Sequence, residues 1–153
     1  MSARHVTLAL ATLALLAACG DGDGDGDVAA RRRALGANPT LAARLAAADA
    51  GRGARLFGQC AACHTIGAGA GDRNGPNLRD VMGAPVAGVS SRFGYTAALR
   101  AHGGRWTDAT MDAWLADPAA VAPGTAMRFP GVRDPLDRAD LIAYLHRQSD
   151  AAR

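Results

Sequence analysis

The sequence places Cys60 and Cys63 two residues apart, with His64 directly after the second cysteine. Closely spaced cysteines serve four chemistries: a structural disulfide, a redox-active dithiol, one half of a zinc site and the covalent attachment of haem. A structural zinc site needs four ligands. Beyond this cluster the remaining candidates are His102 and His146, which are isolated and have no second cysteine pair nearby. A zinc site is therefore disfavoured.

A redox-active pair of the thioredoxin type lies beside a strand of an α/β unit. Here the flanking segment 49–62 contains few β-branched residues and is typical of a helix. We therefore interpret the cluster as a haem attachment site, in which both thiols add across the vinyl groups of the porphyrin. His64 is then the proximal ligand of the iron. The cluster predicts one haem c, bound covalently through Cys60 and Cys63.

A single histidine leaves one axial position of the iron open. The segment 123–131, PGTAMRFPG, presents Met127 between a Pro-Gly turn and a second proline-glycine step, in a stretch too irregular for a helix interior. A thioether is a soft ligand that suits haem iron, so we expect Met127 to be the second axial ligand. The other methionines and histidines of this region are expected in the core (Met82, Met111) and at the surface (His102, His146).

From about Asp49 to Gln148 the sequence resembles the class I cytochromes c of the mitochondrial and bacterial short-chain soluble type. The matching pieces are dispersed and ordered: Gly53, Phe57, CAACHTI, GPNL (75–78), FGYT (93–96), Trp106, PGTAM, Phe129, Gly131 and DLIAYL (140–145). The resemblance implies an all-α fold, the cytochrome c fold. Three to five helices would wrap around one covalently bound haem, and the N- and C-terminal helices of the domain would cross.

The resemblance also implies roles for residues around the haem. The carbonyl of Pro76 would accept a hydrogen bond from His64, and Gly53 would let the first helix cross closely over the last. Tyr95 and Trp106 resemble residues that hydrogen-bond a haem propionate, and Thr125 resembles a hydroxyl near the methionine ligand. The implied cofactor-binding residues are Cys60, Cys63, His64, Pro76, Tyr95, Trp106, Thr125 and Met127. Of these, His64 and Met127 would ligate the metal, and no residue is implied to be catalytic.

Some positions depart from the family pattern. Lysines that surround the haem edge in mitochondrial relatives are replaced by alanines (Ala119, Ala120, Ala126), which argues against docking to a strongly acidic partner. Arg128 and Arg133 would supply a smaller basic rim. Ala84 stands where relatives often have a propionate-binding arginine, and Arg92 and Arg105 are the candidates to replace it.

The N-terminal segment predicts export and anchoring. Residues 1–18 read as a signal peptide with a polar start and an apolar run that is too short for a membrane-spanning helix. LAAC at 16–19 resembles the lipobox of bacterial lipoproteins, so Cys19 is the expected lipidation site. Residues 19–48 would then form the anchor and a tether, solvated over 20–27 and Ala/Arg-rich afterwards, with short helical pieces such as 40–48. The cytochrome domain would span 49–153.

Composition excludes few partners. The net charge is +3, every base is an arginine and every acid an aspartate, a bias that reflects a GC-rich genome. The arginines are scattered apart from residues 31–33, so nucleic acid is not expected as a partner. We expect a monomer on the periplasmic side of a bacterial membrane, lipid-anchored or, alternatively, soluble in the periplasm.

These features predict an electron carrier and not an enzyme. The chain would carry one electron at a time between membrane-associated respiratory or photosynthetic partners, such as a cytochrome bc-type complex, a terminal oxidase or a reductase. Two alternatives remain open at this point. One is a haem c subunit dedicated to a periplasmic dehydrogenase, and the other is a haem peroxidase-type enzyme.

Overall fold

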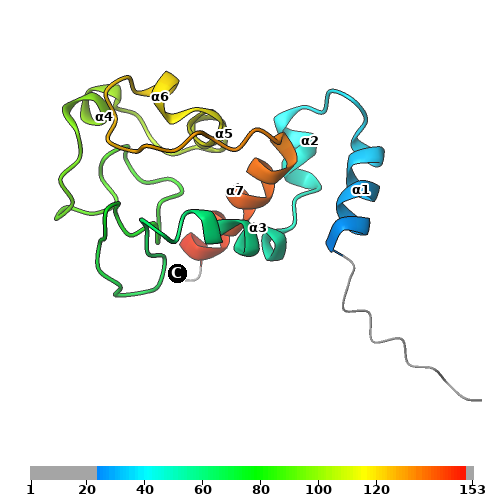
Figure 1. The fold of residues 1–153 in the computed structure, drawn as a ribbon, viewed down its shortest axis with the longest axis horizontal. Helices are drawn as coiled ribbons and strands as arrows, with labels where there is room; N and C mark the ends of the chain where they lie inside the picture. The colour runs from blue at the N-terminus through cyan, green and yellow to red at the C-terminus, as the bar shows by residue number, and fades with distance from the viewer. Residues whose placement is uncertain (1–23, 151–153) are drawn as a thin grey trace, which may run out of the picture.

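The computed structural model describes residues 24–150, which form short helices joined by long loops (Figure 1). In chain order the elements are α1 (Gly24–Leu35), α2 (Leu41–Ala46), α3 (Ala50–Leu56), the 3-10 turn η1 (Phe57–Gln59), α4 (Ala97–His102), α5 (Asp108–Ala116), α6 (Pro118–Val121) and α7 (Pro135–Asp150). Between residues 24 and 150 the only strand-like pairing is an isolated bridge from Pro85 to Arg105. The predicted all-α class is confirmed.

Side chains at the helix starts explain why the elements begin where they do. Thr107 and Thr110 form a reciprocal capping box at the start of α5. Asp117 accepts hydrogen bonds from the first backbone amides of α6. Asp134 Oδ1 accepts a hydrogen bond of 2.8 Å from the amide of Leu136, so it caps α7 as the sequence predicts. Pro135 follows in the first turn, where its missing N–H costs nothing.

The domain is held together where α3 crosses α7. A Cβ atom at Gly53 would lie 2.0 Å from the carbonyl oxygen of Asp140 and 2.8 Å from Cβ of Tyr144. Only glycine allows this approach, which confirms the role expected for Gly53. The atom of α7 that lies nearest to Gly53 belongs to the backbone and not to a side chain. Phe57 packs beside the crossing against Tyr144, with ring centroids 5.4 Å apart.

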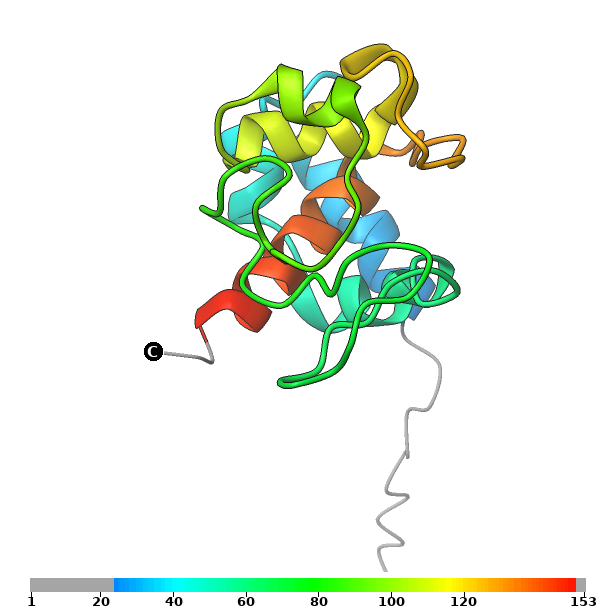
Figure 2. The same ribbon diagram turned by 90° about the vertical axis from the view of Figure 1, so that its left-hand side faces the viewer.

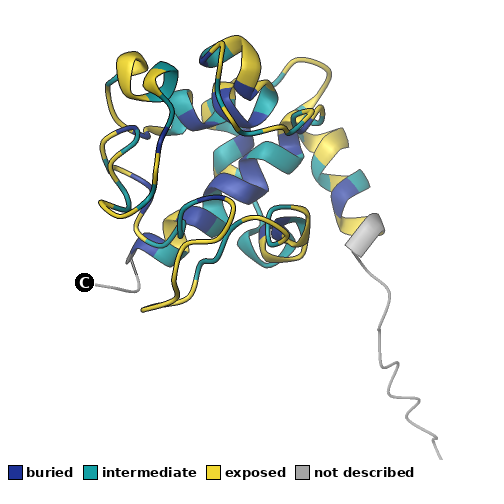
Figure 3. Cartoon of the chain, turned by 60° about the vertical axis from the view of Figure 1, so that its left-hand side comes forward, coloured by how far each residue is buried: buried dark blue, intermediate teal, exposed yellow. Residues whose placement is uncertain are grey.

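The core lies between α3, α5, α7 and the loops that cover them (Figures 2 and 3). Leu141 and Ile142 of α7 are almost completely buried. Trp106 packs on Trp114 of α5 with ring centroids 5.4 Å apart. The expected core positions of Met82 and Met111 and the expected surface positions of His102 and His146 are confirmed.

The segment before the domain is more ordered than the sequence suggests. The sequence predicts a solvated tether over 20–27 and short helical pieces beyond it, but Gly24 already begins α1 and the helix continues to Leu35. Val28 on this helix is buried. Arg31 reaches the carboxylate of Asp140 in α7 through two hydrogen bonds, of 2.7 and 3.1 Å. Over residues 24–27 the prediction of a solvated chain is therefore wrong, because α1 begins there and docks on the domain, whereas a helix over 28–35 agrees with the helical pieces expected beyond residue 27.

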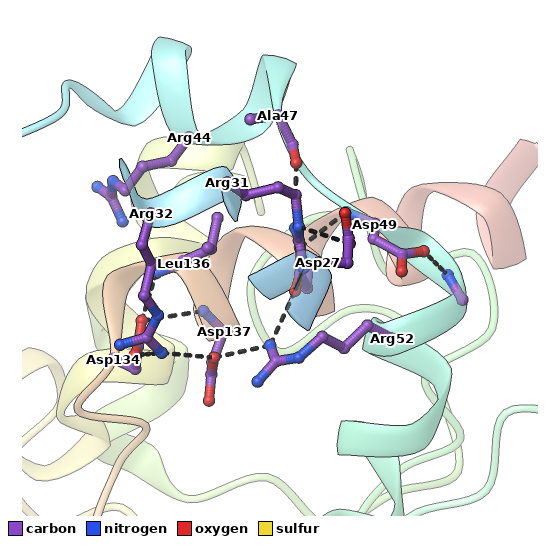
Figure 4. Close-up of polar contacts among 12 residues, drawn as sticks. Asp27, Arg31, Arg32, Arg44, Ala47, Asp49, Arg52, Asp134, Leu136 and Asp137 are labelled. Carbon is purple, nitrogen blue, oxygen red and sulfur yellow. Dashed lines mark hydrogen bonds and ion pairs between the residues drawn. The ribbon is translucent and has the colours of Figure 1, made fainter. Parts of the chain in front are cut away.

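Further ion pairs connect the same elements (Figure 4). Arg52 of α3 contacts Asp137 at 2.7 Å and Asp140 at 2.8 Å. Arg32 pairs with Asp134. Arg44 of α2 donates hydrogen bonds to Asp112 and to the carbonyl of Pro135. A buried charge is tolerated when it is paired and hydrogen-bonded in this way.

The predicted signal peptide and Cys19 lie outside the described residues. Within 24–150, no helix combines the length and the apolar character that crossing a membrane requires.

Candidate haem site

A cavity of about 440 Å³ opens between α5, α7 and the loops around them. This volume is within the range of about 300–1,000 Å³ that is usual for sites that enclose an organic ligand. Its wall is mostly apolar and includes Leu78, Val89, Leu99 and Leu145. Such a wall suits a large, flat, apolar group better than a charged metabolite.

The cysteine motif forms a tight turn at the edge of this cavity. The amide of Cys63 donates to the carbonyl of Cys60 at 3.0 Å, and the amide of His64 donates to the same oxygen at 2.9 Å. The turn continues η1 and points Cys60, Cys63 and His64 at one cavity. The two thiols are not joined in a disulfide.

The environment of Cys60 differs from that of a redox-active thiol. Burial raises the pKa of Cys60 to about 11. Reactive cysteines of the thioredoxin type have lowered pKa values, because a nearby positive charge or helix N-terminus stabilises the thiolate. A redox-active dithiol is therefore disfavoured. Within residues 24–150 no group of three or more metal-binding side chains comes together, which also disfavours zinc.

His64 is held in one orientation by its neighbours. Its Nδ1 atom lies 2.8 Å from the carbonyl oxygen of Pro76, which is the contact expected from the sequence. Burial lowers the pKa of the His64 ring, although the Pro76 contact opposes this shift, so the neutral form is favoured. With Nδ1–H donating to Pro76, Nε2 is left with a free lone pair, as a metal-ligating histidine requires.

Gly75 has a role at this site that the sequence reasoning missed. A Cβ atom at Gly75 would lie between 2.3 and 2.7 Å from three atoms of the His64 ring. The amide of Gly75 also donates to the carbonyl of Cys63 at 2.8 Å. The GPNL motif therefore places a residue without a side chain against the imidazole and a rigid carbonyl beside its Nδ1 atom.

The Met127 loop borders the same cavity and is fixed by its own polar contacts. Thr125 Oγ1 accepts a hydrogen bond of 3.2 Å from the amide of Met127. The amide of Thr125 in turn donates to the carbonyl of Ala122, directly after α6, at 2.9 Å. Met127 is partly buried and lines the cavity. Thr125 thus positions the methionine through its backbone.

Aromatic residues form another part of the wall. The hydroxyl of Tyr95 accepts a hydrogen bond of 3.2 Å from the amide of Ser90, and its ring packs against Phe93. Trp106 and Trp114 line the cavity together. The structure therefore brings all eight predicted cofactor-binding residues to one cavity, while the role of each toward a cofactor stays a prediction.

The arginine at the cavity differs from the two candidates named from the sequence. Arg105 donates to the carbonyl of Gly83 at 2.6 Å, and Arg92 lines a separate polar hollow. Neither lines the main cavity, whereas Arg128 does. Which arginine would hold a haem propionate stays a prediction, to which the structure adds Arg128 as a third candidate. The sequence signal for it was its position directly after Met127.

These residues fit a haem group. A cysteine pair, a neutral imidazole and a thioether border one apolar cavity, and the absent side chain of Gly75 leaves room for the imidazole. The two cysteine thiols would add to the vinyl groups of the haem, and an imidazole and a thioether are the iron ligands of cytochromes c. The walls supplied by Val89 and by Leu99 of α4 were not predicted, because isolated apolar residues in loops and short helices carry no periodic signal.

Comparisons with known proteins agree with this chemistry. The family model for cytochrome c matches residues 50–149. Cytochrome c2 of Rhodomicrobium vannielii is 42% identical over 107 residues, which cover 70% of this chain and 85% of that protein. Cytochrome c of Gossypium barbadense is 41% identical over 104 residues, covering 67% and 92% of the two chains. The solved structure of cytochrome cH from Methylobacterium extorquens matches with a TM-score of 0.61 and 38% identity, over 65% of this chain and 98% of that one.

The matched region contains the whole cysteine motif and the Met127 loop. Proteins of the matched family are electron carriers that bind haem c covalently through cysteines, and Cys60 and Cys63 are those cysteines here. The all-α fold, the cavity and the extent of the match lead to the same conclusion. This chain belongs to the cytochrome c family.

Proposed function

We propose that this single-haem electron carrier is held at the periplasmic face of a bacterial membrane by a lipid on Cys19. There it would pass one electron at a time between membrane-associated respiratory or photosynthetic partners, such as a cytochrome bc-type complex and a terminal oxidase or reductase. The observation that supports the carrier role most strongly is the meeting of the cysteine motif, His64 and Met127 at one apolar cavity. The anchor rests on the LAAC sequence at residues 16–19.

The bound haem c supplies a one-electron couple between ferrous and ferric iron. His64 and Met127 would hold the iron, which would leave no position for oxygen, peroxide or another substrate. Pro76 and Gly75 keep the imidazole in place, and Thr125 keeps the methionine loop in place. Ligands held in this way change little on electron transfer, which keeps the reorganisation small.

The apolar wall adds to this effect. Leu78, Leu99 and Trp114 give the cavity apolar walls. A low-dielectric wall disfavours the additional positive charge of the oxidised centre. A thioether ligand acts in the same direction, since it favours ferrous iron. The residues around the cavity therefore favour a relatively high reduction potential.

The rim of the cavity indicates the kind of partner. The alanines at the positions of the mitochondrial lysines are exposed (Ala119, Ala120, Ala126). Arg128 is exposed beside them. We infer docking through a small, mostly apolar surface with limited charge. Such a surface gives little electrostatic steering, and confinement at the membrane compensates by raising the effective concentration of the carrier.

Ligand access tests the carrier role against the enzyme alternatives. The oxidised protein should react slowly with cyanide and with hydrogen peroxide, because Met127 must first leave the iron. Stopped-flow absorption measurements on the purified holoprotein would show this. Rapid binding of cyanide, or turnover of peroxide, would instead favour a peroxidase-type enzyme.

Replacing the anchor cysteine tests the location. In the variant Cys19→Ser, the mature protein should move from the membrane fraction to the soluble periplasmic fraction, because the acyl chains are lost. Fractionation followed by detection of covalent haem measures the change. The variant Ser2→Ala, which also lies in the predicted signal segment, should leave the distribution unchanged. If Cys19→Ser still sediments with membranes, acylation is not the anchor.

A further inference from the structure

The docked position of α1 has consequences for a carrier that is anchored through Cys19. Arg31 makes a bidentate contact with Asp140, at 2.7 and 3.1 Å, and also donates to the carbonyl of Ala47 at 3.0 Å. The side chain of Asp140 is 0% exposed and that of Arg31 is 13% exposed. Figure 4 shows Arg31 reaching from α1 toward Ala47 and the neighbouring acidic groups.

The Asp140 carboxylate binds three groups, one from α1 and two from the start of α3. Besides Arg31 of α1, it accepts hydrogen bonds from Arg52 of α3 at 2.8 Å and from the amide of Asp49 at 2.7 Å. Asp27 supports the contact from within α1, since its carboxylate lies 3.2 Å from Nε of Arg31. Arg31 is therefore the α1 side chain that enters the α3–α7 junction.

The helix α1 depends on this docking. It has 12 residues, GDGDVAARRRAL, among which are two glycines and only two residues larger than alanine that are apolar. An isolated helix shorter than about 12–15 residues is marginal in water even when its sequence favours helix. Besides the Arg31–Asp140 contact, Val28 is buried and Arg32 pairs with Asp134, but the Arg32 side chain is 52% exposed and exposed pairs contribute little. If Arg31 lost Asp140, α1 would therefore both undock and unfold. α2 would stay in place, because Arg44 holds it to Asp112 and to the Pro135 carbonyl.

Docking sets the length of the chain between the lipid and the domain. Only residues 20–23 lie between Cys19 and the first residue of α1. At about 3.4 Å per residue, the anchor cannot be more than about 17 Å from that residue. With α1 undocked, the free chain would run from Cys19 to Thr40 and could extend to about 70 Å. Its root-mean-square reach would be about 25 Å.

The docked helix also sets which side of the domain faces the lipid. α1 lies at the end of the molecule away from α4 and α6, as Figure 1 shows. The haem cavity is lined by residues from Phe57 onward, and none of them comes from α1 or α2. The exposed residues at its border include Cys63 and Arg128. The chain thus enters the fold on the side away from the cavity.

We infer that the Arg31–Asp140 contact is an orientation lock, which holds the α1 side against the bilayer and turns the haem cavity toward the aqueous phase. This inference rests on the lipid anchor proposed above. The redox partner that fits this arrangement is a protein, or a protruding domain of a membrane complex, that approaches from the periplasmic side. The bilayer itself would not cover the cavity.

The test uses the acylated full-length holoprotein on vesicles of phosphatidylethanolamine and phosphatidylglycerol. The variant Arg31→Ala removes the lock, and Arg33→Ala, an exposed residue of the same helix, is the matched control. Each variant retains two of the three consecutive arginines at which trypsin cleaves. Cleavage within α1 releases the coloured domain from the vesicles. We expect release from Arg31→Ala to be faster by about tenfold or more, because opening exposes the site, while Arg33→Ala behaves like the wild type.

A second measurement reports orientation. Haem quenches a fluorescent headgroup label by energy transfer, so quenching should be low for the wild type and Arg33→Ala and higher for Arg31→Ala.

Equal trypsin release from Arg31→Ala and Arg33→Ala would overturn the lock, and wild-type quenching as high as that of Arg31→Ala would overturn the orientation. Unchanged haem absorption in both variants would show that the domain stays folded. A holoprotein that fails to float with the vesicles would overturn the anchor, and the orientation with it. Trypsin cleavage in solution would then still decide whether Arg31 holds α1.

Discussion

Replacing Met127 by alanine should leave haem c attached through Cys60 and Cys63 but lower its reduction potential strongly. The thioether favours ferrous iron, so its loss removes that preference and lets water or another oxygen or nitrogen ligand stabilise the ferric state. Axial ligands set haem potentials over a range of about 0.8 V, and we expect a decrease on the order of 0.2 V. Spectroelectrochemical titration measures the potential, and the methionine-to-iron charge-transfer band of the oxidised protein should disappear.

The matched control for this experiment is Met111→Leu. Met111 also lines the cavity, but it is buried in α5 and belongs to the core. A change from methionine to leucine conserves volume and usually costs less than about 1.5 kcal/mol. The potential and the charge-transfer band of this variant should stay as in the wild type. If Met111→Leu loses the band and Met127→Ala keeps it, the ligand is Met111.

Removing the carboxylate of Asp140, where α1 and α3 meet α7, should cause a large loss of stability. Asp140→Ala leaves Arg31 and Arg52 without their shared partner and deprives the Asp49 amide of its acceptor. Breaking a buried ion pair from one side costs about 3–5 kcal/mol, because the remaining charge stays buried. Guanidinium-induced unfolding of the holoprotein, followed by circular dichroism, measures the free energy of unfolding.

An exposed aspartate provides the comparison. Asp108 pairs with His146 at 2.6 Å, and the two side chains are 44% and 46% exposed. Exposed pairs contribute about 0–1 kcal/mol, so Asp108→Ala should change the free energy of unfolding by no more than that. Asp140→Asn, which keeps the shape of the side chain, should lie between the two. Equal losses for Asp108→Ala and Asp140→Ala would contradict the structural role given to Asp140.

The sequence predicts those parts of the protein that have local signals. The cap at Asp134, the cysteine motif and the Pro-Gly turns around Met127 are each encoded within a few neighbouring residues. The close approach at Gly53 was predicted only through the family resemblance, since a lone glycine in a helix does not reveal what it touches. The same reasoning explains why the contact of Gly75 with the His64 ring was missed.

The junction of α1 with the domain could not be predicted from such signals. Its main contact joins Arg31 to Asp140, which are 109 positions apart. The composition of the sequence GDGDGDGD favours a solvated chain. The docked helix is stable only because side chains that are distant in the sequence bind it. Arg128 is exposed, as the sequence predicts, but its position at the cavity could not be predicted, because it depends on how the loops fold together.

The most direct test of the whole account is the absorption spectrum of the purified chain, produced in a host that attaches haem c, in both oxidation states and with a pyridine haemochrome assay. We predict one covalently bound haem per chain and a low-spin, six-coordinate iron whether reduced or oxidised. A colourless chain, or a five-coordinate iron in either state, would contradict it.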